Sequence, residues 1–409
     1  MSNEDRLSNP PPAPEARPSA PPQNELSGVT AVEGTPFGKY QLVKKIGVGG
    51  MASIHLASLE GPDGFQKKVV VKRVHAHLAE VPGFSDMFAT EARVAARLSH
   101  PHVAQVYEYG TIDATPYLAM EWVDGPTLHQ LIRHAARAGV TLPPELAIVI
   151  GVQLCDALHY AHELCHEDGR WMGLVHRDVS PSNVLVGLDG GVKLIDFGIA
   201  KETEGPSMTK TGMLKGKLAY MAPEQLAGSV DRRTDVFALG VVLYELAVSK
   251  RLFKRATDAE TLTAVVQCQV ADPRRLVPGF PSDLAAVLER ALEKDPSRRY
   301  SSAAEMGHDL EEIALRRGIS VSRRGVLTAL KELPLEGLGA GKGASSWSSP
   351  SRPSTPSLSG TRSMEDSDPL LPALAPPELA ATSSNAIPII VGITAVLLLT
   401  IAMWWVALG

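Results

Sequence analysis

Residues 176–183 read His176-Arg177-Asp178-Val179-Ser180-Pro181-Ser182-Asn183, and thirteen residues beyond this run the sequence reads Asp196-Phe197-Gly198. A phosphoryl transfer needs one group that orients the attacking hydroxyl and others that hold metal ions on the phosphates. Asp178, Asn183 and Asp196 have the order and spacing for these roles. The sequence therefore predicts a magnesium–nucleotide site built from them, which the flanking segments can support or weaken.

The composition predicts a mostly globular chain. Its 409 residues suggest about two to three domains, with 44% hydrophobic and 21% charged residues. The net charge of −5 and the lack of a basic run argue against a nucleic-acid binder. The cysteines Cys155, Cys165 and Cys268 cannot form a disulfide framework and suit a reducing compartment. We expect the folded part to face the cytoplasm.

The N-terminal residues 1–36 are rich in proline and poor in large apolar side chains, so we expect a disordered arm. No charged start followed by an apolar run is present, and nothing here reads as a secretory signal. The chain should therefore begin its folded part close to Tyr40.

The pattern beyond Tyr40 predicts strands at Gln41–Ile46 and Ser53–Ser58. The residues between them read Gly47-Val48-Gly49-Gly50-Met51-Ala52. Glycines allow a backbone to approach phosphates closely with its amide groups turned towards them. An ordinary glycine-rich hairpin remains the alternative, because such short motifs also occur by chance.

A third predicted strand, Lys68–Val74, contains Lys72 within an apolar run. A lysine in such a strand is costly to bury unless a carboxylate pairs with it. The following segment Phe84–Leu98 reads as a helix and carries Glu91. We therefore predict a Lys72–Glu91 pair. Two further strands are expected at Val103–Tyr109 and Pro116–Trp122.

Taken in order, these motifs resemble the protein kinase superfamily over about residues 40 to 316, with Ala52 in place of the usual third glycine of the phosphate loop. The resemblance implies an α+β, bilobal fold over residues 37–316, with a small antiparallel sheet lobe carrying one main helix and a larger helical lobe. Within the superfamily the chain is similar to bacterial serine/threonine kinases of the eukaryotic-like type.

The resemblance implies ATP and Mg²⁺, or Mn²⁺, as cofactors. Asp178 would act on the substrate hydroxyl, Lys72 and Glu91 would position the phosphates, and Asn183 and Asp196 would hold the metal. Met120 would be the gatekeeper beside the adenine, with Glu121 and Val123 offering backbone hydrogen bonds. The remaining nucleotide contacts would come from Ile46, Gly47, Val48, Gly49, Gly50, Met51, Ala52, Ile54, Val70 and Leu185.

The polar stretch 199–221 resembles an activation segment and ends in Ala222-Pro223-Glu224. By the resemblance, Glu224 would pair with Arg299, and Asp235 would hold the backbone of the catalytic loop. Thr209 and Thr211 are the preferred phosphorylation sites, with plain solvated hydroxyls as the alternative.

The chain departs from the family at two positions. Family members usually carry a lysine where this chain has Ser180, and a threonine where it has Lys217. In the family these two positions meet beside the catalytic aspartate. A lysine lost at one and gained at the other would keep a cation near the transferred phosphate. We therefore add Lys217 to the predicted catalytic residues; a weak kinase or a scaffold is the alternative.

The predicted helix Glu145–Leu164 and the residues after it place Cys155, His159, His162 and His166 on one face. One straight helix cannot wrap a tetrahedral ion, so packing and a polar helix end explain these residues better than a metal site. The stretch from Cys165 to Trp171 reads as a small insertion without an assigned role.

The C-terminal part divides into three predicted segments. Residues 317–336 read as a short helical extension, residues 337–385 as a Gly, Ser and Pro-rich linker, and residues 386–409 as a transmembrane helix. Its residues 387–408 carry no charge, and about 20 apolar residues suffice to cross a bilayer. A buried core helix is the alternative. We expect the lipid bilayer to be a partner and the chain to be a single-pass protein of the cell membrane.

Three functional hypotheses remain open from the sequence. The first is a membrane-anchored kinase that phosphorylates serine and threonine hydroxyls of proteins and regulates itself by autophosphorylation, for which two copies would associate. The second is a pseudokinase-type nucleotide-binding scaffold, and the third is a small-molecule kinase. The retained motif residues favour activity, and the long segment ending at Glu224 favours protein acceptors.

Overall fold

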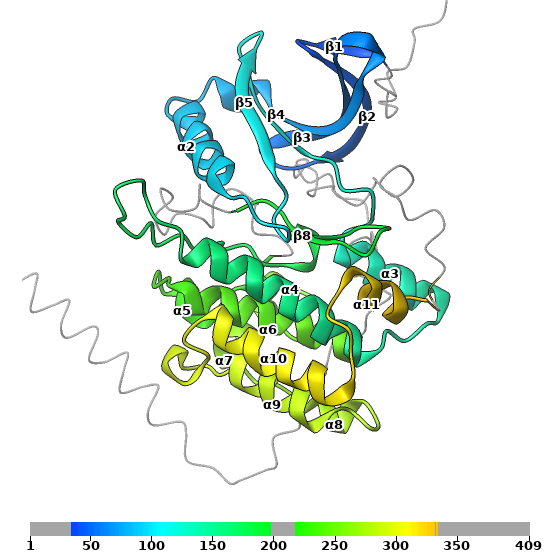
Figure 1. The fold of residues 1–409 in the computed structure, drawn as a ribbon. Helices are drawn as coiled ribbons and strands as arrows, with labels where there is room; N and C mark the ends of the chain where they lie inside the picture. Colours follow the sequence, from blue (N-terminus) through cyan, green and yellow to red (C-terminus); the bar gives the residue numbers. More distant parts are fainter. Residues whose placement is uncertain (1–33, 198–216, 332, 334–409) are drawn as a thin grey trace, which may run out of the picture.

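The computed structural model describes residues 34–197, 217–331 and 333, and these form two lobes, a sheet lobe and a helical lobe (Figure 1). The predicted bilobal kinase fold is thus confirmed. The predicted arm, most of the activation segment with Thr209 and Thr211, the linker and the span 386–409 lie outside the described residues. Among the helices that are described, none is long and apolar enough to cross a bilayer.

The sheet lobe is one antiparallel sheet of six strands in the order β1-β2-β3-β4-β6-β5. The strands are β1 (Thr35–Phe37), β2 (Tyr40–Val48), β3 (Ala52–Glu60), β4 (Gln66–Val74), β5 (Val106–Ile112) and β6 (Thr115–Glu121). Lys72 on β4 lies opposite Ile54 on β3 and Leu118 on β6, so Lys72 stands in the middle of the sheet.

The prediction that this strand begins at Val103 is wrong, because β5 begins at Val106 and the chain before it bonds instead to Leu194. Val103 forms a parallel bridge with Leu194, and the amide of Ala104 donates to the carbonyl of Leu194 at 3.0 Å. Leu194 lies in β8 (Val192–Leu194), which pairs with β7 (Val184–Val186). These contacts connect the sheet lobe to the strands that follow the loop at residues 176–183.

One face of the large sheet is covered by α2 (Phe84–Arg97), as Figure 1 shows. Phe84, Phe88 and Ala92 are buried on this helix and cluster with Val74 and Leu118 of the sheet. This apolar face explains why the segment forms a helix on the sheet. A short helix, α1 (Ala76–Ala79), precedes it.

The helical lobe is built around α4 (Pro144–His162) and α6 (Arg232–Val248). Nearly all of α6 is buried, as expected for a helix that is apolar on every side. Around these two lie α3 (Leu128–Ala138), α5 (Pro223–Leu226), α7 (Asp258–Gln267), α8 (Pro273–Leu276), α9 (Ser282–Ala291), α10 (Ala303–Arg317) and α11 (Arg323–Ala329).

The helix α10 packs directly on α4. A Cβ atom at Gly151 would lie 2.8 Å from Leu310, and one at Gly307 would lie 3.0 Å from Cys155. Glycine at both positions therefore allows the two helices to approach closely. The buried Cys155 thus serves this helix contact.

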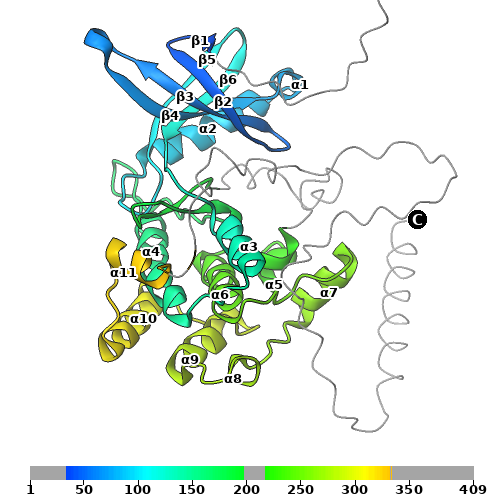
Figure 2. The ribbon, with the colours of Figure 1, turned by 90° about the vertical axis from the view of Figure 1, so that its right-hand side faces the viewer.

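Two smaller features complete the lobe. The helix α11 lies within the predicted extension and packs on α4 (Figure 2), with Val326 and Leu330 in the apolar core. The insertion after α4 is a tight hairpin in which Cys165 pairs with Trp171. The indole of Trp171 donates to the carbonyl of His162 at 2.6 Å, which ties the hairpin to the end of α4.

Candidate active site

The backbone of the loop at residues 176–183 is held by Asp235, a fully buried carboxylate on α6. Its oxygens accept hydrogen bonds from the amides of His176 at 2.7 Å and Arg177 at 2.8 Å. They also accept one from Nε2 of the buried His162 on α4, at 2.8 Å. Burial acts to raise the pKa of Asp235, but His162 and the other donors outweigh it and hold the pKa below its usual range.

This network makes the loop part of the helical core. The sequence predicts the part played by Asp235 but assigns His162 only to packing and a polar helix end. The fixed backbone includes Arg177 at φ +61°, a left-handed conformation that a non-glycine residue rarely adopts. The three hydrogen bonds that Asp235 accepts hold the backbone of Arg177 in this strained conformation.

Asp178 projects from this loop next to two donors. Its Oδ2 accepts a hydrogen bond from Nδ2 of Asn183 at 2.9 Å, and Nδ2 also donates to the carbonyl of Asp178 at 2.8 Å. The ammonium of Lys217 contacts the same Oδ2. The structure therefore brings together Asp178, Asn183 and Lys217, as the sequence predicts.

The sheet lobe contributes Lys72, whose Nζ lies 2.9 Å from Oδ1 of Asp196. Burial acts to lower the pKa of Lys72, but the charges of Asp196 and then Glu91 raise it above its usual value. Burial acts to raise the pKa of Asp196, but Lys72 and then Lys217 lower it below its usual range. Both groups therefore carry their charges at neutral pH.

The structure adds a second carboxylate to the predicted pairing of Lys72. Asp196 lies at ion-pair distance from the ammonium of Lys72, and the charge of Glu91 on α2 also raises the pKa of Lys72. Asp196, with φ +55°, follows β8 and faces Lys72 across the cleft. The order of the motifs in the sequence did not indicate this second partner.

The residues fit a bound Mg²⁺ or Mn²⁺. Asn183 donates with its amide nitrogen to Asp178, so its carbonyl oxygen is the atom suited to a cation. Asp196 supplies a carboxylate. Burial acts to raise its pKa, but the charge of Lys72 outweighs this and lowers the pKa below its usual range. Oxygen ligands of these two kinds, together with phosphates, are those that Mg²⁺ takes.

A cleft between the lobes is lined mainly by apolar side chains with a few polar groups, as is usual for small-molecule sites. Of the predicted nucleotide contacts, the cleft is lined by Ile46, Ile54, Val70, Lys72, Met120, Glu121, Val123 and Leu185, and the predicted metal ligand Asp196 also lines it. Sequence reasoning missed further lining residues, namely Trp122, Gly125, Thr127, Gln130 and Ile195. A Cβ atom at Gly125 would lie 2.1 Å from the carbonyl oxygen of Val186, so this position requires glycine.

The predicted phosphate loop, Gly47–Ala52, covers the end of β2, the turn at residues 49–51 and the first residue of β3, next to the cleft-lining Ile46 and close to Ile54. The amide of Gly49 donates to the carbonyl of Ala52 at 2.8 Å. Nε2 of His75 donates to the carbonyl of Gly49 at 2.9 Å. This histidine, which no motif identifies, therefore helps to fix the turn.

At the other end of the cleft, the side chain of Glu121 is used for structure. Its Oε2 accepts from Nζ of Lys193 at 2.9 Å and from the amide of Gln105 at 3.0 Å. These bonds connect β6 to β8 and to the chain before β5. Only the backbone of Glu121 and Val123 is predicted to bind a ligand, and this prediction is compatible with the side-chain contacts.

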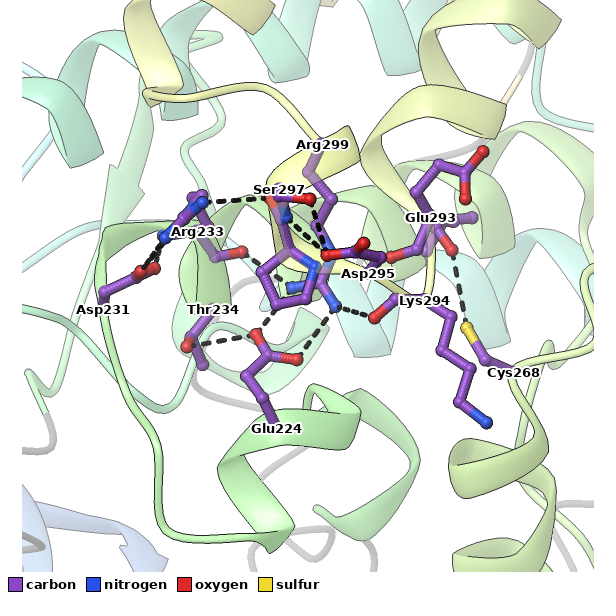
Figure 3. Close-up of polar contacts among 12 residues, drawn as sticks. Glu224, Asp231, Arg233, Thr234, Cys268, Glu293, Lys294, Asp295, Ser297 and Arg299 are labelled. Atoms are coloured by element: carbon purple, nitrogen blue, oxygen red, sulfur yellow. Dashed lines mark hydrogen bonds and ion pairs between the residues drawn. The ribbon is translucent and has the colours of Figure 1, made fainter.

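The chain from Lys217 to Glu224 is anchored in the helical lobe at two places. The hydroxyl of Tyr220 donates to the buried Glu245 at 2.7 Å and contacts Arg251. Glu224 makes two hydrogen bonds with the guanidinium of Arg299, at 2.6 and 2.9 Å (Figure 3). The predicted Glu224–Arg299 pair is thus confirmed.

The guanidinium of Arg299 also donates to three backbone carbonyls. These belong to Glu293 at 2.6 Å, Lys294 at 3.0 Å and Arg233 at 3.3 Å. Arg299 has a fully buried side chain, and these bonds satisfy its nitrogens. Arg299 therefore joins Glu224, on α5, to the backbone of Arg233 on α6 and to the turn that follows α9.

Comparison with known proteins decides the family. A model described as "Protein kinase domain" matches residues 40–310. The chain belongs to the protein kinase family. The kinase is 43% identical over 277 residues to the tyrosine-protein kinase MasK of Myxococcus xanthus, with 68% of this chain and 43% of that protein covered. It is 36% identical over 278 residues to the serine/threonine-protein kinase PknB of Mycobacterium leprae, with coverages of 66% and 42%.

Among solved structures, the kinase resembles the PknI kinase domain of Mycobacterium tuberculosis. The TM-score is 0.53 and the sequence identity 29%, and the match covers 70% of this chain and 99% of that one. The chain spans about two fifths of the length of the curated relatives described above. The shared part is therefore the kinase domain.

One buried hydroxyl, two residues after Asp178, remains unexplained by the motifs. Ser180 is 3% exposed, and its Oγ has no hydrogen-bond partner in the part of the chain that the structure describes. Buried polar groups are nearly always bonded. This position, two residues after Asp178, is one of the two at which the kinase departs from its family.

Proposed function

We propose that this chain is an Mg²⁺-ATP-dependent protein kinase that transfers the γ-phosphate of ATP to serine and threonine hydroxyls. The observation that carries this proposal is the arrangement around Asp178. Its carboxylate is held by Asn183 and Lys217 in the same cleft that contains the Lys72–Asp196 ion pair.

In the proposed reaction the hydroxyl oxygen of the acceptor bonds to the γ-phosphorus. The bond from that phosphorus to the bridging oxygen breaks, and ADP keeps the electron pair. Asp178 orients the hydroxyl and accepts its proton. Lys72 positions the phosphates, and Glu91 supports the charge of Lys72. Mg²⁺ or Mn²⁺ held by Asn183 and Asp196 would neutralise charge on the phosphates.

The preference for serine and threonine rests on two arguments. The catalytic loop lacks the alanine-arginine pattern usual in tyrosine kinases, and several similar curated proteins are serine/threonine-protein kinases by name. One similar protein is instead a tyrosine-protein kinase by name. The identity of the phosphorylated amino acid therefore needs to be measured directly.

The test is transfer of labelled γ-phosphate by the purified full chain, with Mg²⁺ or with EDTA, followed by phosphoamino-acid analysis. We expect label on phosphoserine and phosphothreonine only when Mg²⁺ is present. Label on tyrosine alone would contradict the specificity. ATP binding without any transfer to protein would favour the alternative, a nucleotide-binding scaffold.

We further propose that residues 387–408 anchor the kinase in the cell membrane with its catalytic domain in the cytoplasm. The support is the length of this uncharged run. Removal of residues 386–409 should move the protein to the soluble fraction without changing its activity on a soluble substrate. Membrane recovery of the shortened protein would contradict this.

We also propose autophosphorylation of the activation segment at Thr209 or Thr211, which self-association of two copies would allow in trans. Added phosphate groups order segments through charge-assisted hydrogen bonds with basic side chains. Mass spectrometry of the active protein should find phosphate on one of these threonines. A segment without phosphate in fully active protein would contradict this.

A further inference from the structure

The cleft contains two carboxylates that face the reacting groups, and each has an ammonium beside it. Lys72 of the sheet lobe pairs with Asp196 at 2.9 Å. Lys217 contacts Oδ2 of Asp178. Lys217 thus touches the carboxylate to which the acceptor proton is proposed to go. Its side chain is 43% exposed, so it can also reach a ligand in the cleft.

The catalytic loop itself supplies a neutral side chain near this point. Ser180, two residues after Asp178, is buried with an Oγ that lacks a partner among the described residues. The cation beside Asp178 therefore comes from a different segment. Lys217 directly precedes the short 3₁₀ turn Leu218–Tyr220, and thirty-three residues separate it from Asn183 at the end of the loop.

The position of Lys217 depends on an anchor three residues further on. The hydroxyl of Tyr220 donates to Glu245 at 2.7 Å and contacts Arg251. Glu245 is fully buried on α6, where it also accepts from Arg251 and from the amide of Leu252, both at 3.0 Å. The backbone of Tyr220 is joined to that of Lys217 by a 3.1 Å hydrogen bond. Tyr220 thus fixes the turn that presents the lysine.

We propose that Lys217 is the catalytic cation beside the transferred phosphate, and that the Tyr220–Glu245–Arg251 anchor positions it, so that seating of this segment and completion of the active site are one event. This inference rests on the proposed function. In an enzyme whose cation lies on the catalytic loop, displacement of the segment that contains residues 217–220 would leave that charge in place. In this chain the same displacement would move the charge of Lys217 away from Asp178.

The electrostatics of the cleft agree with this placement. Lys217 places a positive charge in direct contact with the carboxylate of Asp178. Preorganised charge at the place where negative charge moves is a large contribution to catalysis, typically about 100- to 1000-fold for one group.

The first test is the substitution Lys217→Thr in the full chain. We expect kcat to fall about 100-fold while the KM for ATP changes by less than about threefold, because the lysine acts mainly in the transition state. Lys217→Arg keeps a cation and should retain more activity than Lys217→Thr. The matched control is Lys68→Thr, which removes the same charge from an exposed site on β4 and should change neither constant.

The second test moves the cation to the catalytic loop. Ser180→Lys combined with Lys217→Thr should recover at least about tenfold of the lost kcat, and a double-mutant cycle should show coupling between the sites. In this double variant, Tyr220→Phe should change kcat by less than about twofold. In the parent, Tyr220→Phe should lower kcat about tenfold, because a small displacement of the lysine is costly.

The outcomes separate the inference from the proposed function. If the parent transfers phosphate and Lys217→Thr does so at a similar rate, the inference is wrong and the proposed function stands. Equal sensitivity to Tyr220→Phe in both backgrounds would show that the anchor acts without the lysine. If Ser180→Lys prevents folding, the Lys217→Arg and Lys217→Thr pair still decides whether the cation matters. A parent that transfers no phosphate overturns both.

Discussion

The two lobes differ in how their cores are built. In the helical lobe the buried apolar side chains form one continuous cluster, and buried polar groups such as Asp235, Glu245 and Arg299 lie within or beside it. In the sheet lobe they form two small, separate clusters. One contains Tyr40 and Leu42, and the other joins α2 to the inner strands.

This difference assigns different tasks to the lobes. The groups that would handle the acceptor, Asp178, Asn183 and Lys217, all come from the helical lobe and are held by its buried polar network. The sheet lobe contributes Lys72 and most of the apolar cover of the cleft. We therefore expect changes in the helical network to affect stability and turnover together. Changes on the cleft face of the sheet should affect nucleotide handling.

The largest effect is expected for Asp235→Ala. It leaves His162 and the amides of His176 and Arg177 without their acceptor, and each buried unsatisfied donor costs about 1 to 3 kcal/mol. We expect the free energy of unfolding to fall by about 4 kcal/mol in urea titrations, with loss of activity.

The matched control for this change is Asp231→Ala at the start of the same helix. Asp231 caps α6 through the amide of Arg233 at 2.7 Å and is more exposed. Loss of such a cap costs about 1 kcal/mol. Equal effects of the two substitutions would show that the buried network does not hold the loop, and the contrast between the lobes would fail.

The next prediction concerns the ion pair between Lys72 and Asp196, which connects the two lobes. Lys72→Met removes the ammonium that pairs with Asp196 across the cleft. We expect kcat/KM for ATP to fall about 100-fold or more, because the phosphates lose a positioning charge. Steady-state kinetics would measure this, with the exposed Lys68→Met as a control. A change in unfolding free energy without a change in kcat/KM would instead give Lys72 a purely structural role.

The smallest effect distinguishes the two faces of β4. Val70 lines the cleft, whereas Val69 lies in the apolar cluster on the opposite face. Val70→Ala should weaken ATP binding about fivefold through lost apolar contact. Val69→Ala should lower the unfolding free energy by about 2 kcal/mol but leave ATP affinity unchanged. Calorimetric titration and urea unfolding of both variants would show whether the faces are separable; equal effects on affinity would contradict the assignment.

Much of the fold and site could be predicted from sequence because the informative residues occur in short motifs with fixed order. The Glu224–Arg299 pair and the contact of Lys217 with Asp178 were both expected on that basis. Motifs say less about which of several nearby groups a side chain contacts in the folded protein. The ion pair of Lys72 with Asp196, for example, was not predicted, since a contact across the cleft depends on how the lobes pack.

Other features had no sequence signal at all. His162 stood among several histidines on one helix face, and only the position of α6 shows that it meets Asp235. His75 bonds to the backbone carbonyl of Gly49 at the glycine-rich turn. Every residue has such a carbonyl, so the sequence does not indicate which one a histidine will contact. The missed cleft residues, such as Thr127 and Gln130, belong to the chain that connects the lobes and to α3.

The most direct test of the account concerns Asp178. Single-turnover transfer of labelled phosphate should be compared between the full chain and its Asp178→Asn variant, with ATP affinity measured in parallel. Asparagine keeps the size of the side chain but cannot accept the proton, so we predict a rate lower by about 1000-fold and an ATP affinity within about threefold of the parent. Transfer by the variant at close to the parent rate would contradict the account, because the acceptor proton would then go elsewhere.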